Sequence, residues 1–209
     1  MTGERTGIVG LVLAGGLSRR MGGGDKCLRP LGGAPILSRI CERAAPQVER
    51  LALNANGDPR RFAAYGLPVV SDSVPDYAGP LAGILAGLDW AAAAAPEARY
   101  LASFAADAPF LPADLVRRLD AGRAAAAADL ACAASDGQRH PVFGLWPIEL
   151  REALRQALIE EEIRKVDRWT QRYRLAVVDF PATPIDPFFN INTPEDLARA
   201  ERWLESLKR

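Results

Sequence analysis

Residues 8–26 read IVGLVLAGGLSRRMGGGDK, an uninterrupted apolar run that passes directly into a loop of glycines and cations. An apolar run without polar alternation is typical of a strand buried on both faces of a parallel sheet. Glycines let the loop backbone approach a ligand, and its exposed N–H groups form a concavity for anions. Arg19, Arg20 and Lys26 add positive charge, which suits a phosphate chain. This stretch therefore predicts a buried strand followed by a phosphate-binding loop.

Two better-known phosphate loops do not match these residues. A Walker A loop needs Ser or Thr directly after its lysine, whereas Cys27 follows Lys26. The dinucleotide-binding pattern G-x-G-x-x-G fits no register of the glycines. The alternative is a surface loop with incidental charge, which the position directly after a buried strand disfavours.

Along the rest of the chain, short apolar runs alternate with segments of helical periodicity. We expect strands at 50–54, 67–72, 100–106, 130–134, 141–145 and 175–180. We expect helices at 35–48, 81–95 and 147–160, one that opens at 111–114 with Pro112 near its first turn, and one from 194 to about 208 capped by Thr193. This alternation favours an α/β fold. The expected architecture is a single three-layer, Rossmann-like domain over residues 1–209 with a mostly parallel central sheet.

Composition excludes several classes of protein. Lys plus Arg and Asp plus Glu each total 26, so the net charge is zero, and we expect no nucleic-acid partner. Three cysteines, far apart and odd in number, and a single histidine do not form a structural zinc site or a disulfide framework. No secretory signal and no apolar segment of about 18 residues is present, so we expect no membrane partner and a cytoplasmic location.

Acidic residues end two of the expected strands. Asp72 and Asp107 each follow an apolar run, and ligands of open α/β sheets bind beyond the carboxyl ends of the strands. Both carboxylates are therefore expected beside the glycine loop. The alternative for Asp72 is ordinary turn chemistry, and for Asp107 a helix cap or a turn before Pro109.

Several motifs together resemble the nucleotidyltransferases of the molybdenum-cofactor guanylyltransferase type, within the nucleotide-diphospho-sugar transferase fold. These motifs are LAGGxSxRMGxxxK at 13–26, NAN at 54–56, Asp72, DYxGPLAG at 76–83, DxPF at 107–110 and NINTPEDL at 190–197. They follow one another over nearly the whole chain. The related cytidylyl-transferring enzymes usually carry Ala-Ala-Gly where this chain has Ala14-Gly15-Gly16.

The resemblance implies transfer of GMP from GTP to molybdopterin, with release of pyrophosphate. It implies that the N-terminal part binds the nucleotide through Leu13, Ala14, Gly15, Gly16, Lys26, Asn54, Asp72 and Asp107. Arg20 and Lys26 would neutralise the triphosphate, and Asp107 would hold Mg²⁺, the cofactor that nucleotidyl transfer needs. Arg20, Lys26 and Asp107 are therefore the expected catalytic residues.

The acceptor is expected to bind to the C-terminal part. Asn190 and Asn192 bracket Ile191 on an extended segment, so both side chains should face one side. The matching segment of the family lies near the pterin. The alternative is that these asparagines hold the turn before the last helix.

Some residues keep two interpretations. Asp25 either orients Lys26 or is simply solvated. His140, the lone histidine, stands between Arg139 and Pro141 at the start of a strand near the expected acceptor region, where it is either a structural residue, as a lone histidine more often is, or part of that region. The basic run at 164–174 is either a solvated helix face or a site for the acceptor or a partner.

The expected partners are the substrates GTP and molybdopterin, with transient contacts to molybdoenzymes or their chaperones, and the protein is expected to be a monomer. Alternative functions are a cytidylyltransferase for the same pterin, a sugar-phosphate nucleotidyltransferase, and a non-enzymatic adaptor that binds nucleotide or cofactor.

Overall fold

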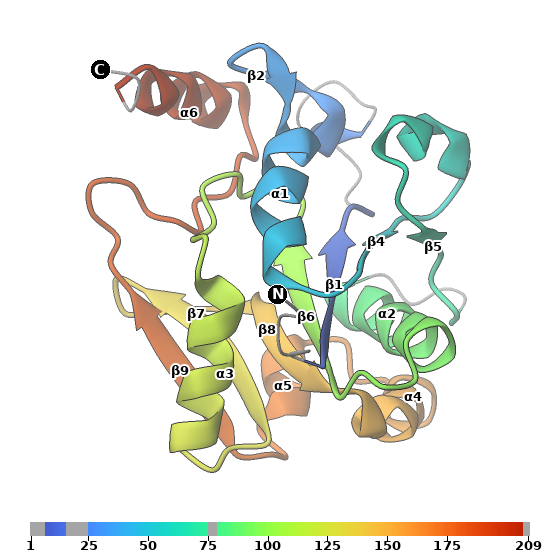
Figure 1. The fold of residues 1–209 in the computed structure, drawn as a ribbon. Helices are drawn as coiled ribbons and strands as arrows, with labels where there is room; N and C mark the ends of the chain where they lie inside the picture. Colours follow the sequence, from blue (N-terminus) through green and yellow to red (C-terminus); the bar gives the residue numbers. More distant parts are fainter. Residues whose placement is uncertain (1–6, 16–24, 75–78, 207–209) are drawn as a thin grey trace, which may run out of the picture.

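A computed structural model describes residues 7–15, 25–74 and 79–206, and in these residues the chain folds around a seven-stranded sheet of order β5-β4-β1-β6-β8-β7-β9 (Figure 1). Its strands are β1 (Ile8–Leu13), β4 (Leu51–Asn54), β5 (Val69–Val70), β6 (Tyr100–Ala105), β7 (Leu130–Ser135), β8 (Gln138–Pro147) and β9 (Leu175–Phe180). Of these strands, β8 alone runs antiparallel to its neighbours. The expected mostly parallel sheet is confirmed.

The order of the strands creates a switch point beside β1. The chain passes from β1 to β4 and β5 on one side, and then returns to β6 on the other side. Leu13 pairs with Asn54 of β4 and with Ala105 of β6, so three strand ends meet at one edge of the sheet. A crevice forms at such a point because the segments that leave the two strands diverge.

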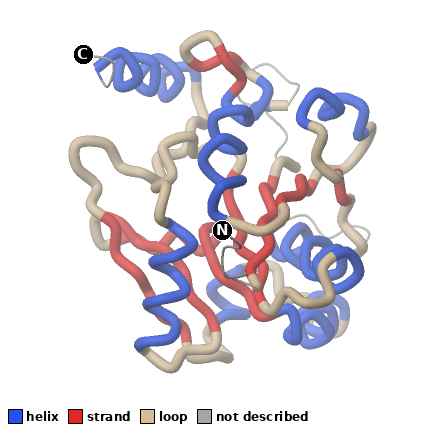
Figure 2. The backbone as a smooth tube through the Cα atoms, in the orientation of Figure 1, coloured by secondary structure: helices blue, strands red, loops and turns tan. Residues whose placement is uncertain are grey.

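Helices cover both faces of the sheet, which makes three layers (Figure 2). The helices are α1 (Ile36–Ala44), α2 (Pro80–Ala94), α3 (Leu115–Ala125), α4 (Arg151–Ile159), α5 (Val166–Thr170) and α6 (Pro194–Ser206). Helices α1 and α3 pack into one apolar core, and α2, α4 and α5 into the other. Buried side chains of β1 alternate between the two cores, as the uninterrupted apolar run predicts.

Helix α2 is buried along most of its length because it is apolar around nearly its whole circumference. It carries two glycines where it approaches the sheet. A Cβ atom at Gly87 would lie 2.5 Å from Cδ2 of Leu11, and one at Gly83 would lie 2.7 Å from Cδ2 of Leu13. These glycines therefore let α2 lie close to β1.

Two local features differ from the sequence expectations. Strand β5 is reduced to Val69–Val70, because it pairs on one side only and the preceding Pro68 has no N–H to donate. Helix α3 starts at Leu115 rather than at 111–114. Its first turn is completed by another element, since Gln47 accepts a hydrogen bond from Val116 N at 3.0 Å.

The small hairpin of β2 (Pro30–Leu31) and β3 (Ala34–Pro35) was not expected from the sequence, and the bounds of helix α5 inside the basic run at 164–174 were not predicted. Short elements of two to five residues carry too little periodicity to be recognised.

The last helix starts as predicted. Thr193 Oγ1 accepts a hydrogen bond from Asp196 N at 3.2 Å, and Asp196 Oδ2 accepts one from Thr193 N at 2.9 Å. This reciprocal pair is a capping box closed by an aspartate. It sets where the segment before α6 leaves the sheet edge.

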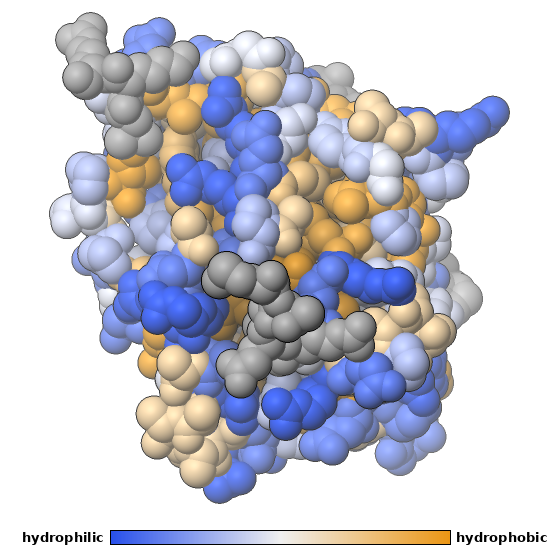
Figure 3. Space-filling model, viewed as in Figure 1, coloured by the Kyte–Doolittle hydropathy of each residue, from blue (hydrophilic) through white to orange (hydrophobic). Residues whose placement is uncertain are grey.

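The surface agrees with the balanced charge of the chain. On the face seen in Figure 3, hydrophilic and hydrophobic residues are interspersed rather than separated into two regions. Among the helices of the described residues, none combines the length and apolar composition that crossing a bilayer requires.

Candidate functional site

A cleft of about 880 Å³ opens at the sheet edge where β1, β4 and β6 end. Protein pockets for small molecules commonly measure about 300–1,000 Å³. Its lining comes from the ends of three strands and the residues that follow, which are Leu13 to Gly15 at β1, Asn54 and Asn56 at β4 and Ala105 to Asp107 at β6, and from Arg139 to Phe143 of β8. Because β8 is antiparallel, its first half lies at the same edge as the carboxyl ends of its neighbours.

The centre of the cleft brings together a cation, a carboxylate and an amide. Lys26 Nζ donates hydrogen bonds to Asp107 Oδ2 at 2.6 Å and to Asn192 Oδ1 at 2.7 Å. The backbone supports this contact, since Ile191 N donates to Asp107 O at 2.9 Å and the Ile191 side chain is fully buried. Asn190 lines the cleft. Asn192 is not a lining residue but contacts Lys26, which is one, so both asparagines lie at the cleft.

The β4 side of the cleft holds a second polar cluster. Asn54 is 5% exposed and donates from Nδ2 to Asp72 Oδ1 at 2.8 Å and to Val70 O at 3.2 Å. Asn56 donates to Asp72 Oδ2 at 2.8 Å and accepts from Asp72 N at 2.9 Å. Asp72 therefore fixes the orientation of both asparagine side chains.

Helix α2 limits the space around this cluster. A Cβ atom at Gly83 would lie only 2.4 Å from Asn54 Oδ1. Asn54 is thereby held between the helix and Asp72.

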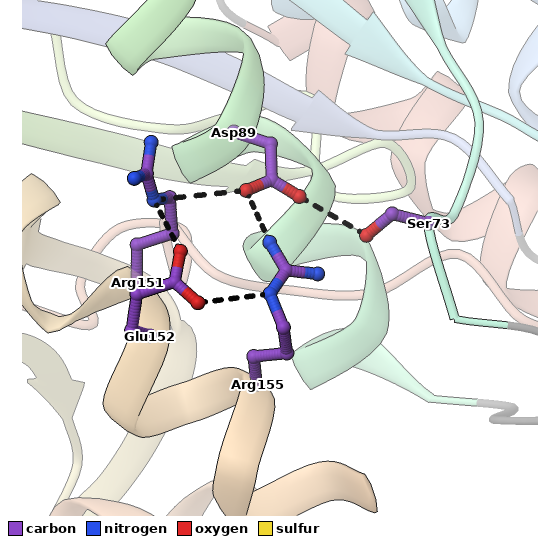
Figure 4. Close-up of polar contacts among 5 residues, drawn as sticks. All are labelled: Ser73, Asp89, Arg151, Glu152 and Arg155. Carbon is purple, nitrogen blue, oxygen red and sulfur yellow. Dashed lines mark hydrogen bonds and ion pairs between the residues drawn. The ribbon is translucent and has the colours of Figure 1, made fainter.

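The segment that follows Asp72 is tied to two helices (Figure 4). Ser73 Oγ donates to Asp89 Oδ2 of α2 at 3.1 Å, and Asp89 Oδ1 accepts from Arg155 of α4 at 2.6 Å. Arg151 and Glu152 complete the cluster, with Arg151 Nε 3.9 Å from Asp89 Oδ1. These side chains are partly solvated, so each pair stabilises the fold by only about 0–1 kcal/mol. Together these contacts hold Ser73 in place, and with it the neighbouring Asp72.

The start of the glycine loop is held by the sheet. Ala14 N donates to Asn54 O at 2.8 Å, and Ala106 N donates to Leu13 O at 3.3 Å. Gly16 and Arg20, both expected site residues, lie outside the described residues.

Asp25 does not orient Lys26, so that interpretation was wrong. Its carboxylate lies 3.0 Å from Arg61 Nε, and Lys26 is oriented by Asp107 and Asn192.

The residues present fit a Mg²⁺ ion that arrives with a nucleotide. Among the described residues no group of three or more His, Cys, Asp or Glu side chains could hold a metal by themselves. Asp107 supplies one carboxylate, 22% exposed and directed at the cleft. Mg²⁺ commonly binds through one or two carboxylates together with substrate phosphates and water. Such a donor set suits this cleft better than a permanent metal centre.

The bulge that shapes the β8 half of the cleft was not predicted from the sequence, although Arg139, His140 and Pro141 were expected near the acceptor region. The β7–β8 hairpin turns at Asp136 and Gly137, whose φ angles are +47° and +73°. Beyond it the register shifts, with Ala133 opposite His140 but Cys132 opposite Gly144. Residues 141–143 therefore bulge from the ladder, at Pro141, which has no N–H to donate. The Asp-Gly pair and Pro141 were the available sequence signals.

Ser103 of β6 satisfies the polar groups that this bulge leaves unpaired. Its hydroxyl donates to Val142 O at 2.5 Å and accepts from Trp146 Nε1 at 2.7 Å. Ser103 is 1% exposed. The bulge is therefore a defined part of the cleft wall.

The thiols do not provide nucleophiles. Burial raises the pKa of Cys27 to about 12, and those of Cys41 and Cys132 to about 11. The nearby Asp25 carboxylate adds to the effect at Cys27, which lines the cleft. All three remain protonated near neutral pH.

Two arginines of the basic run at 164–174 have acidic partners. Arg172 pairs with Glu161, and Arg174 lies 3.0 Å from Asp129. Both pairs are solvent-exposed, which agrees with the interpretation of this run as a solvated surface.

Comparisons with known proteins agree with this geometry. The model of the MobA-like NTP transferase domain matches residues 10–175. A Bradyrhizobium sp. (strain ORS 278) protein named molybdenum cofactor guanylyltransferase is 62% identical over 197 residues, which cover 94% of this chain and 93% of that protein.

Solved structures share the fold. The molybdopterin-guanine dinucleotide biosynthesis protein A from Archaeoglobus fulgidus superposes with a TM-score of 0.73 at 25% identity, covering 95% of this chain and 99% of the other. Rv0371C from Mycobacterium tuberculosis, solved in complex with manganese, has a TM-score of 0.65 at 19% identity, covering 93% and 98%.

Proposed function

The chain belongs to the MobA-like NTP transferase family, and from this premise we propose that it transfers GMP from GTP to molybdopterin, releasing pyrophosphate and forming the guanine dinucleotide cofactor. The observation that carries the proposal is the meeting of Lys26, Asp107 and Asn192 in a cleft at the switch point of the sheet. The Lys26 ammonium and the Asp107 carboxylate meet at one point of the cleft. A triphosphate requires such a cation, and its metal ion requires such a carboxylate.

The acceptor is the terminal phosphate of molybdopterin, in its free or molybdenum-loaded form. A phosphate oxygen forms a bond to the α-phosphorus of GTP, and the bond between that phosphorus and the bridging oxygen to the β-phosphate breaks. Since a phosphate is already ionised near pH 7, the step needs no strong general base. Catalysis then consists of positioning the two substrates and neutralising charge.

The nucleotide would occupy the N-terminal half of the cleft. Backbone N–H groups of Gly15 and Gly16 would face the phosphates, and Lys26 and Arg20 would neutralise them. Leu13 and Ala14 line the cleft beside them. Asn54, held by Asp72, would contact the nucleoside.

A divalent metal ion is the expected cofactor of this family, and we propose Mg²⁺. Asp107 would hold it, with the remaining ligands coming from phosphate oxygens and water. When bound, Mg²⁺ neutralises charge on the reacting phosphates. Lys26 contacts Asp107 Oδ2 and would carry its charge to the same phosphates.

The C-terminal half of the cleft would bind the acceptor, with Asn190 and Asn192 among its contacts. We propose that residues 1–209 act as a single domain and as a monomer in the cytoplasm, and that the product passes by transient contact to molybdoenzymes or their chaperones. Light scattering of the purified protein would test the monomer.

A product assay tests the proposed function. The protein would be incubated with Mg²⁺ and molybdenum-loaded molybdopterin, with GTP, CTP or ATP supplied separately, and the products analysed by mass spectrometry. Guanine dinucleotide from GTP alone is the expected result. Product from CTP alone would move the protein to the cytidylyl branch. Protein that binds GTP and forms no dinucleotide would instead fit a sugar-phosphate nucleotidyltransferase or a binding adaptor.

A further inference from the structure

The β8 side of the cleft contains a polar chain that the functions assigned above do not use. In the sheet order, β8 and β4 lie on opposite sides of the β1–β6 pair, so this side is separate from the Asn54 cluster. His140 lines the cleft here, beside Arg139 and Pro141. His140 Nε2 lies 2.7 Å from Ser135 Oγ, and Ser135 Oγ lies 2.8 Å from Asp186 Oδ1.

The hydrogen atoms of this chain have one favourable arrangement. A carboxylate accepts hydrogen bonds and cannot donate, and a serine hydroxyl has a single hydrogen. Ser135 must donate to Asp186, because otherwise two oxygens with facing lone pairs would lie 2.8 Å apart. Ser135 Oγ can then only accept from His140, which places the imidazole proton on Nε2.

The surroundings hold this arrangement in place. Ser135 is 1% exposed, and Asp186 Oδ1 also accepts from Phe188 N at 3.0 Å. The ring of Phe188 packs against the imidazole, with the centroids 4.7 Å apart. Burial lowers the pKa of His140, while Asp186 opposes the shift. The ring is therefore neutral near pH 7.

A neutral imidazole with its proton on Nε2 has a lone pair on Nδ1. No described residue forms a hydrogen bond with Nδ1. Serine stands in the middle of this chain and donates to the aspartate, so it is not activated by the histidine and the three residues are not a nucleophilic triad. The chemistry that remains is the acceptance of one hydrogen bond from a ligand.

We propose that His140 is a specificity residue of the acceptor subsite, which accepts through Nδ1 a hydrogen bond from an N–H group of the acceptor's heteroaromatic ring. Ser135 and Asp186 are positioning residues that set the tautomer. The inference rests on the proposed function, because a pterin ring carries N–H donors and GTP binds on the other side of the cleft. Exposed Arg139 adds a positive charge to this subsite for an anionic acceptor.

The first test needs no activity. His140 is the only histidine among the 209 residues, so ¹⁵N NMR of histidine-labelled protein reports on it alone. We expect a neutral ring protonated at Nε2 at pH 7.5, and a mixed tautomer population in the Ser135→Ala variant. A wild-type ring protonated at Nδ1, or a tautomer unchanged by Ser135→Ala, would overturn the positioning role.

The second test is kinetic and uses two substitutions that differ in geometry. In His140→Gln the side-chain amide can replace Nε2 and reach Ser135, but no hydrogen-bond acceptor remains near the position of Nδ1. In His140→Asn the amide oxygen can take the place of Nδ1. We expect His140→Gln to raise the KM for the acceptor about tenfold, the effect of one unpaired polar group, with the KM for GTP unchanged. His140→Asn should recover much of this loss.

The control is Gln138→Ala, exposed on the same strand and expected to behave as wild type. Thermal unfolding of each variant confirms that it is folded. A His140→Gln protein with an unchanged KM for the acceptor, or with KM values for both substrates raised equally, would overturn the inference. A wild-type protein that forms no dinucleotide refutes the proposed function, whereas normal wild-type turnover beside an unaffected His140→Gln refutes this inference alone.

Discussion

Replacing Gly83 by alanine should weaken GTP binding by a route that the structure specifies. The added Cβ atom would lie 2.4 Å from Asn54 Oδ1 and 2.7 Å from Cδ2 of Leu13, whereas ordinary contacts begin at 3.4 Å. Asn54 must therefore move by about 1 Å, the difference between 3.4 and 2.4 Å. Such a shift breaks its 2.8 Å hydrogen bond to Asp72 and disturbs the 3.2 Å bond to Val70 O, because these two bonds orient the buried amide.

The magnitude follows from two opposing effects on stability and one on binding. Overpacking lowers the free energy of unfolding by about 1–3 kcal/mol, and the higher helix propensity of alanine than of glycine raises it by about 1 kcal/mol. The free energy of unfolding should thus fall by about 0–2 kcal/mol. Misplacing one hydrogen-bonding group of the nucleotide site should raise the Kd for GTP about tenfold.

Gly87→Ala is the matched control, one turn further along α2. Its Cβ atom would lie 2.5 Å from Cδ2 of Leu11 and 2.9 Å from Cδ2 of Leu101, both core side chains away from the cleft. The two variants should lose similar stability in denaturant, while isothermal titration with GTP should separate them. Equal losses of GTP affinity, or an unchanged Kd in Gly83→Ala, would refute the role given to Asn54.

Three further predictions concern other parts of the site. Asp107→Asn should lower kcat by a factor of at least about 100 in the product assay, because the metal carboxylate is lost, while thermal unfolding stays cooperative; full activity would contradict the metal assignment. Ser103→Ala should lower the free energy of unfolding by about 1–3 kcal/mol, since Trp146 Nε1 and Val142 O lose their partner, which urea titration measures. The pKa of His140 in the folded protein is below its usual 6.5, so just below pH 6.5 the unfolded chain binds more protons than the folded one. The free energy of unfolding should therefore fall as the pH drops below 6.5. The difference in stability between wild type and His140→Gln, followed by urea titration from pH 7.5 to 5.5, should show that slope, and a pH-independent difference would refute it.

Local sequence pattern was sufficient for much of the fold. The apolar run at 8–13, the alternating strands and helices, and the Thr193 cap were all predicted because periodicity and capping act between residues close in the chain. The positions of Asp72 and Asp107 at strand ends also followed, since parallel strands end at a common edge.

Contacts between distant segments could not be predicted in this way. Lys26 meets Asp107 and Asn192, which are 81 and 166 residues away, because the strand order returns β6 beside β1 and Ile191 is buried next to Asp107. The same dependence explains why Asp25 pairs with Arg61, and why Gln47 completes the first turn of α3.

The β8 half of the cleft depended most on tertiary structure. A register shift at Pro141 and the hydroxyl of Ser103 create the bulge, and Asp186 reaches Ser135 from a segment 51 residues away. Residue type identified the groups proposed to bind phosphate, metal and nucleotide. Which of them meet, and which atom of His140 is left for a ligand, is set by sheet order and burial, because hydrogen-bond partners in a folded core are chosen by proximity in space rather than along the chain.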